Sequence, residues 1–261
     1  MISLSSAQLD AWLAAFAWPL ARILALIASA PVNGNPSVPM RVKIGLGLLI
    51  TMLVAPFLPP GPNVAPASGE GLLILAQQIL IGLALGLAMH VVLHAVEMAG
   101  EIIGLQMGLG FATLYDASVP GMIPIIGQFL GVIVSLAFLA VNGHVLVLAA
   151  LVESFQVLPF APVSAPSGLL VLVQWAGNIF AFGLALALPL LAALLITNIA
   201  LGVLTSVAPQ LNIFAVGFPL TILVGLAALA LALPYFAPNF ERMFMEGLQA
   251  MLRVAAALVS R

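Results

Sequence analysis

From residue 44 to residue 241 the chain has no lysine or arginine, and most of this stretch is apolar. Lys43 is the last basic residue before it, and Arg242 is the first after it. Soluble domains need charge over their surface, and about a quarter of their residues are charged. Here only 5% of the 261 residues are charged and 64% are hydrophobic. The sequence therefore predicts an integral membrane protein.

Composition also narrows the possible functions. A spanning helix needs about 20 mostly apolar residues, so the chain has room for at most about ten spans and no separate catalytic domain. The net charge of −2, without a basic stripe, does not suit a nucleic-acid partner. There is no cysteine, so disulfide and thiolate chemistry are excluded. We expect a single membrane domain over residues 1–261, with no cofactor.

Apolar runs separated by proline- and glycine-rich breaks predict an all-α fold of long, kinked helical hairpins. The first run lacks the basic start of a signal peptide, so we expect it to be a retained helix. Pro189 predicts a kink, and residues after 239 predict an amphipathic helix, lying at an interface or on the protein's own surface. The expected helices are 6–30, 38–57, 72–108, 122–157 with a bend at Asn142-Gly143, 169–207, 213–235 and the tail 239–260.

The basic residues outside the apolar stretch bear on membrane orientation. One group, Arg41 and Lys43, follows the first helix, and a second group lies in the tail. The positive-inside rule places both groups on one side, which requires an odd number of crossings before the tail. Six elements are expected there, so either one of them does not cross the membrane or the rule fails here.

Four polar residues share one face of the helix expected at 72–108, because their spacings are four, three and four. They could form a metal site or a proton relay. The simplest interpretation is a polar stripe that faces protein or a watery lumen. A charge at mid-bilayer costs roughly 3 kcal/mol, so countercharge is expected from another subunit or from water. The stripe consists of His90, His94, Glu97 and Glu101.

Small residues repeat every fourth position on the same helix, at Gly100, Gly104 and Gly108. Such repeats let helix backbones approach closely inside membranes. The pattern predicts a tight helix contact, and we expect this small face to pack against a neighbouring subunit.

The break at residues 109–121 is unusual because it is apolar and aromatic, with Asp116 as its single charge. Loops are normally polar, since their backbone must meet water. Irregular backbone at membrane depth is tolerated only when it is buried in protein or lines a cavity. The segment is therefore either a packed re-entrant turn or a plug inside a pore.

No catalytic constellation stands out in the sequence. Asn142-Gly143-His144 and Thr197-Asn198 are isolated polar spots, whose usual meaning is an interhelical hydrogen bond. There is no Ser–His–Asp set, phosphate-binding glycine loop or zinc-finger spacing. The sequence gives no reason to expect an enzyme.

Several motifs, in order along essentially the whole chain, resemble the FliR family, the R-type export-gate subunits of flagellar type III secretion, with relatives in virulence injectisomes. His90 and His94 are not part of the family pattern, which further lowers the case for a metal. The motifs are Ala99-Gly100-Glu101-Ile102-Ile103-Gly104-Leu105-Gln106-Met107-Gly108, Phe111-Ala112-Thr113, Asn142-Gly143-His144, Leu158-Pro159, Ala208-Pro209-Gln210-Leu211-Asn212-Ile213-Phe214 and Gly217-Phe218-Pro219.

The resemblance implies a gate subunit in the bacterial inner membrane, at the flagellar basal body. Its partners would be FliP and FliQ in a helical hetero-oligomeric assembly, FlhB around the closed gate, and FlhA nearby. Unfolded rod, hook and filament subunits would pass through the central channel. In the family the helices form bent hairpins partly raised out of the membrane, which would explain the conflict over the number of crossings.

The resemblance also implies a role for the apolar break, because the family's loop at this place acts as a plug. Carried over, the plug covers residues 108–120, with Phe111, Leu114 and Tyr115 as the expected pore-blocking side chains. Glycines at both ends would let it swing. Its residues include Gly108, Gly110, Phe111, Ala112, Thr113, Leu114, Tyr115, Asp116 and Pro120.

Two rival functions remain open at the level of sequence. One is a proton-coupled secondary transporter that uses Glu97 or Glu101, although the internal repeat typical of such transporters is not evident. The other is a structural membrane scaffold whose apolar break does not face a lumen.

Overall fold

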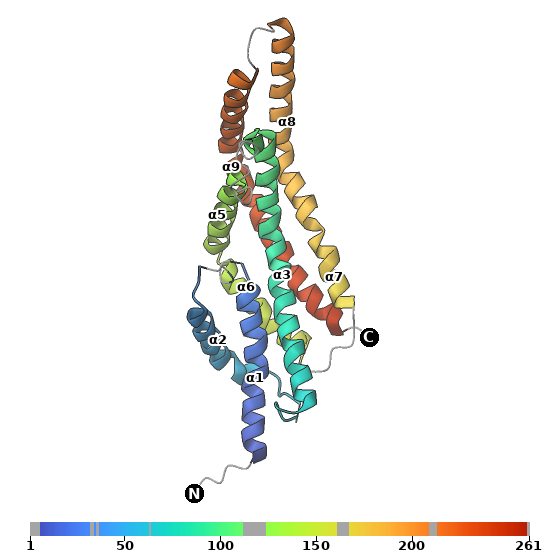
Figure 1. Cartoon of the computed structure of the whole chain (residues 1–261). Coiled ribbons are helices and arrows are strands. Elements are labelled where there is room, and N and C mark those ends of the chain that lie inside the picture. Colours follow the sequence, from blue (N-terminus) through green and yellow to red (C-terminus); the bar gives the residue numbers. More distant parts are fainter. Residues whose placement is uncertain are drawn as a thin grey trace. The chain divides into compact units, whose positions relative to one another are not determined.

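The computed structural model describes residues 6–31, 34, 37–62, 64–111, 124–160, 167–208 and 213–259 (Figure 1). The secondary-structure elements within these described residues are helices, which confirms the predicted all-α fold. They are α1 (Ser6–Ser29), α2 (Met40–Val54), the 3-10 turn η1 (Ala55–Phe57), α3 (Gly69–Gln106), η2 (Leu109–Phe111), α5 (Ile125–Ala140), α6 (Gly143–Val157), α7 (Ser167–Ala176), α8 (Asn178–Val207) and α9 (Ile213–Val259).

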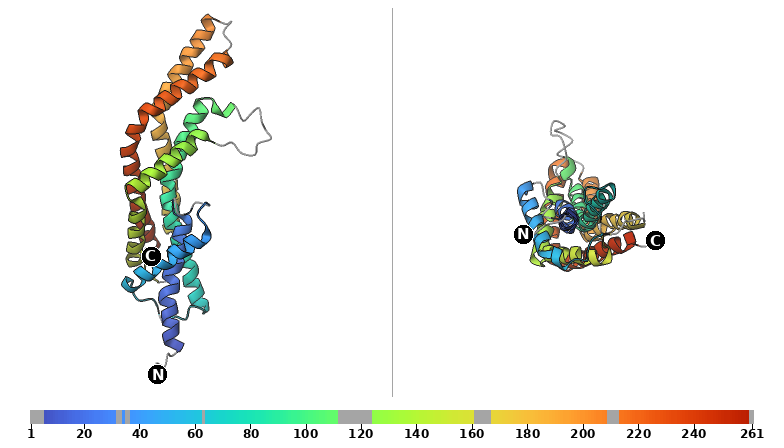
Figure 2. Two further views of the ribbon diagram at one scale, coloured as in Figure 1. Left: turned by 90° about the vertical axis from the view of Figure 1, so that its left-hand side faces the viewer. Right: turned by 90° about the horizontal axis from the view of Figure 1, so that it is seen from below.

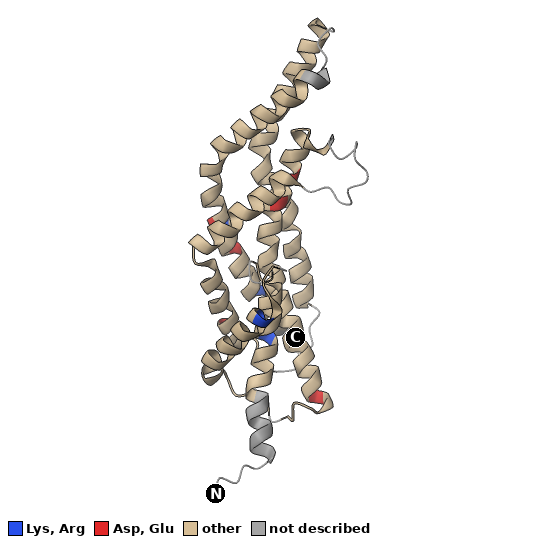
Figure 3. Cartoon of the chain, turned by 60° about the vertical axis from the view of Figure 1, so that its left-hand side comes forward, with Lys and Arg blue, Asp and Glu red and all other residues tan. Residues whose placement is uncertain are grey.

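Several helices are long and apolar enough to cross a membrane. In the described residues there are four such candidates, or five if α5 and α6 together form one span. Their exposed side chains are largely apolar, as at Leu53 on α2 and Ile196 on α8, which are 71% and 69% exposed. Charged residues are sparse (Figure 3). The chain is therefore an integral membrane protein, as its composition predicts.

Prolines lie inside three of the long helices, with Pro19 in α1 and the others in α8 and α9. α9 is one helix of 47 residues that contains Pro219, Pro234 and Pro238, whereas the sequence separates 213–235 from an amphipathic tail. Pro189 lies inside α8. A proline removes one backbone donor, but neighbouring groups in membrane helices can compensate for the lost bond. Proline content alone therefore misplaces the end of a helix here.

The break expected at Asn142-Gly143 is present between α5 and α6. α5 ends at Ala140 and α6 begins at Gly143. Asn142 between them has a left-handed backbone, with φ 55°. Asparagine tolerates this conformation better than most residues with a side chain.

The apolar stripe of the tail is buried within the chain. Phe240, Met243 and Phe244 are between 2% and 4% exposed, and Met251 and Ala255 are fully buried. Of the two interpretations of the tail, the structure favours a helix that packs on its own protein.

The chain divides into two compact units, each assembled from segments far apart in sequence. In unit 2, for example, part of α3 lies beside α5 (Figure 2). Unit 1 contains Met1–Val91, Asn142–Ala176 and Phe244–Arg261, and unit 2 contains Val92–Val141 and Gly177–Met243. Neither unit is a continuous stretch, so the division does not correspond to two successive domains.

Unit 1 has at its centre a buried arginine that sequence analysis does not single out. Arg22 of α1 is fully buried. Its Nε donates to Gln78 Oε1 of α3 at 2.8 Å. Its Nη1 donates to the carbonyl oxygen and Oγ of Ser154 at 3.1 and 3.2 Å, and its Nη2 to the carbonyl oxygen of Leu158 at 2.9 Å. The guanidinium also lies 4.2 Å from the centre of the Phe155 ring. One cation thus ties α1 to α3 and α6 through neutral acceptors.

Two polar side chains of α7 hydrogen-bond to other helices of unit 1. Trp175 Nε1 donates to the carbonyl oxygen of Ala88 on α3 at 2.7 Å. Ser167 Oγ donates to the carbonyl oxygen of Ala257 on α9, also at 2.7 Å. Satisfying these donors inside an apolar unit avoids the penalty of a buried unpaired group.

Candidate functional site

The candidate site is the base of the apolar break, where α3 ends and α5 begins, within unit 2. Gly108 and Gly110 are described, and Phe111 is described as the backbone of η2. The other predicted plug residues lie outside the described part of the chain: Ala112, Thr113, Leu114, Tyr115, Asp116 and Pro120.

The end of α3 is fixed against α9. Met107 is fully buried, and its carbonyl oxygen accepts a hydrogen bond from Thr221 Oγ1 at 3.1 Å. Gly108 has φ +86°, a conformation that residues with a side chain rarely adopt. A Cβ built on it would lie 2.8 Å from the ring of Phe218. The turn into the apolar break therefore requires glycine for both its backbone conformation and its space.

α3 and α5 touch backbone to backbone below this turn. A Cβ built on Gly100 would lie 2.6 Å from the Cα of Gly127, so the two glycines are in direct contact. One turn further along α3, a Cβ on Gly104 would be 3.5 Å from the nearest atom of Ile126, an ordinary contact. The small face thus contacts α5 of the same chain at Gly100 and Gly104. Its use against a neighbouring subunit stays a prediction.

Residues on the α5 side of this contact are missed by the sequence analysis. Gly127 and Gly131 are four apart and repeat the spacing seen on α3, a signal that could have identified α5 as the partner helix. A Cβ on Gly131 would lie 3.0 Å from Glu97 Oε1, so α5 also leaves room for this carboxylate. Thr221 and Phe218 on α9 carry no such pattern, and their part in fixing the turn is visible only in the fold.

The polar stripe is placed on α3, with two of its members paired. His94 Nδ1 and Glu97 Oε2 are 2.8 Å apart, and their side chains are 55% and 45% exposed. Glu101 is exposed and His90 is half-buried. Across the described ranges, no group of three or more metal-ligating side chains forms that could hold an ion.

The contacts at this site fix the backbone on both sides of the apolar break. The turn at Gly108 is fixed on α9, and α5, which begins at Ile125, is in backbone contact with α3. Both ends of the apolar break are therefore held on rigid elements of one unit.

Comparison with known proteins places the chain among bacterial export proteins. The family model described as bacterial export proteins, family 1, matches residues 13–247. The chain is 44% identical over 249 residues to the flagellar biosynthetic protein FliR of Pectobacterium carotovorum subsp. carotovorum, with 94% of each chain covered. It is 44% identical over 247 residues to FliR of Escherichia coli (strain K12), with the same coverage. FliR of Bacillus subtilis (strain 168) is 27% identical over 246 residues, which cover 93% of this chain and 95% of that relative. The chain therefore belongs to family 1 of the bacterial export proteins.

Proposed function

We propose that the chain is an export-gate subunit of the flagellar type III secretion apparatus, in the bacterial inner membrane at the basal body. The observation that carries this proposal is the near full-length similarity to flagellar FliR proteins. The helices support it, because their apolar outer surfaces need lipid or sister subunits around them. FliP, FliQ, FlhB and FlhA are the proposed partners. The alternative, a proton-coupled transporter that uses Glu97 and Glu101, gains no support from this family.

The finer proposal concerns residues 108–120, which would close the channel at rest. An apolar segment across a lumen excludes ions by steric closure and dewetting. The anchored ends support this role, because a closure that moves must be attached to parts that do not. Gly108 gives the segment an abrupt turn off α3, and α5 receives it next to the Gly100–Gly127 contact. Unfolded flagellar subunits would displace the segment as they enter.

Crosslinking to a secretion substrate tests whether this segment lines the path. The chain has no cysteine, so any disulfide that it forms with the substrate must come from the single introduced thiol. We expect Phe111→Cys to form a disulfide with a cysteine in a substrate stalled by a folded domain at its trailing end. The matched control is Leu53→Cys on α2, whose native side chain is 71% exposed. Equal crosslinking from the two positions would remove the support for a path along the segment.

A further inference from the structure

Unit 2 contains a pocket between α8 and α9 that the proposed gating does not use. Its volume is about 250 Å³. Pockets for whole small ligands measure roughly 300–1,000 Å³, so this one suits part of a larger, flexible molecule. Most of its lining is apolar, including Leu186 and Pro189 on α8 and Ala232 on α9. An apolar slot of this kind between two membrane helices is suited to an acyl chain.

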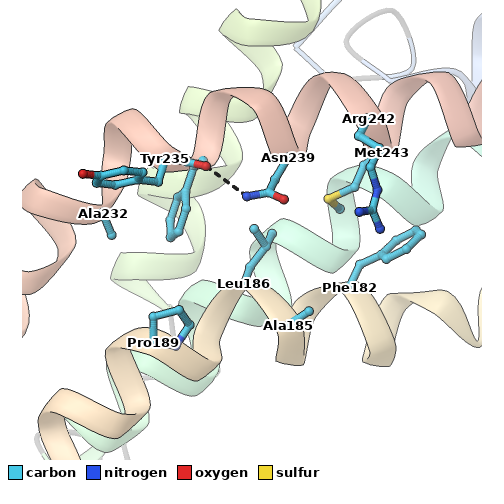
Figure 4. A pocket seen from close by; sticks show the side chains of 10 residues that line it. Phe182, Ala185, Leu186, Pro189, Ala232, Tyr235, Asn239, Arg242 and Met243 are labelled. Carbon is cyan, nitrogen blue, oxygen red and sulfur yellow. Dashed lines mark hydrogen bonds between the residues drawn. The ribbon is translucent and has the colours of Figure 1, made fainter.

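One end of the pocket is cationic. Arg242 and Phe182 lie at that end, and Pro189 and Ala232 lie at the other (Figure 4). Arg242 is the one lysine or arginine in the sequence of unit 2. Ala232 and Arg242 are ten residues apart on α9, which is about 15 Å along a helix. The pocket therefore has the polarity of a lipid, with a charge at one end and hydrocarbon along the rest.

The position of Arg242 along α9 matches a membrane surface. The candidate span Val216–Leu258 covers most of α9, and residues 216–240 contain no charge. About 20 apolar residues are enough to cross the hydrocarbon core. The apolar part of α9 can therefore cross before Arg242, which leaves Arg242 at headgroup level. Tyr235 also lines the pocket and is 74% exposed, and tyrosine is enriched at this boundary.

We propose that this pocket binds an anionic phospholipid, with its phosphate on Arg242 and one acyl chain along Leu186 and Pro189. A guanidinium has five N–H donors and binds a phosphate with two of them. An anionic headgroup without an amine is preferred, because Arg242 would repel the ammonium of a zwitterionic headgroup. The bound lipid fills the space between α8 and α9.

Lipid retention by the intact protein tests the proposal. The full chain, extracted with the proteins it assembles with, is mixed with micelles containing phosphatidylglycerol or phosphatidylcholine and examined by native mass spectrometry. We expect phosphatidylglycerol to be retained in preference. Arg242→Gln is expected to reduce its retention about tenfold, the effect of losing one charge-assisted contact. Arg253→Gln is the matched control, because Arg253 lies beside the Trp175 ring in unit 1 and outside the pocket.

A second pair of variants tests the apolar part. Ala232→Phe fills the pocket and should lower the retention of both lipids, whereas Ala237→Phe on the same helix lies outside the pocket lining and should not. In cells, a photoreactive benzoylphenylalanine in place of Tyr235 should crosslink to phosphatidylglycerol. Crosslinking to a protein subunit, or unchanged retention in Arg242→Gln, would overturn the proposal. Neither result depends on whether residues 108–120 close a channel.

Discussion

Arg22→Leu is expected to lower the free energy of unfolding of unit 1 by about 2–6 kcal/mol, because two buried acceptors lose their donor and each loss costs about 1–3 kcal/mol. These acceptors are Gln78 Oε1 and the carbonyl oxygen of Leu158. The Ser154 carbonyl still accepts a hydrogen bond from the backbone N–H of Leu158 at 2.9 Å, so its loss of Arg22 adds less to the destabilisation. The measurement is thermal unfolding of the purified protein, together with its abundance in membranes.

Two further substitutions make this result specific. Arg22→Lys should have an unfolding temperature between those of the parent and Arg22→Leu, because one ammonium cannot reproduce the planar fork that reaches both α3 and α6. Arg41→Leu is the matched control, since Arg41 is exposed on α2. If Arg22→Leu unfolds at the temperature of Arg41→Leu, the guanidinium does not hold unit 1 together.

Gly100→Ala is expected to destabilise unit 2 by about 1–3 kcal/mol, the usual effect of overpacking a well-filled interior. The new methyl group would meet the backbone of Gly127 at 2.6 Å and the carbonyl oxygen of Ile126 at 2.8 Å. Backbone cannot rotate away as a side chain can, so α3 and α5 would have to separate. Because these helices hold both ends of the apolar break, we expect the loss of stability to be accompanied by loss of complex assembly and of protein export. Thermal unfolding and swimming motility measure the two effects.

Gly104→Ala is the matched control for this substitution, one turn away on the same helix. Its methyl group would be 3.5 Å from the nearest Ile126 atom, which is ordinary contact. Alanine favours a helix over glycine by about 1 kcal/mol, so this variant should be neutral or more stable. Equal losses from Gly100→Ala and Gly104→Ala would show that the α3–α5 contact is not as tight as described.

Some of this architecture could be predicted from the sequence for physical reasons. Long apolar runs can satisfy their backbone in lipid only as helices, and Asn142-Gly143 indicates where one helix ends. The fourfold spacing of Gly100, Gly104 and Gly108 indicates close packing but not its partner. Pro234 and Pro238 favour the end of a helix, yet α9 continues through them.

The Arg22 cluster could not be predicted, because its partners are 56 to 136 residues away in sequence. No local pattern distinguishes an arginine that ties three helices from one that lies at a membrane surface. The same holds for Thr221, whose acceptor on Met107 is 114 residues away. Contacts of this kind depend on how the helices come together, and local spacing does not record that.

Ion conductance through the assembled gate is the most direct test of whether residues 108–120 close a channel. The proposal predicts that deleting residues 110–116 makes membranes leak small ions while the complex still assembles. Replacing the same residues with glycine and serine should also leak, because a polar segment of equal length does not dewet the lumen. If both variants assemble and stay as tight to ions as the parent, the segment is not the closure.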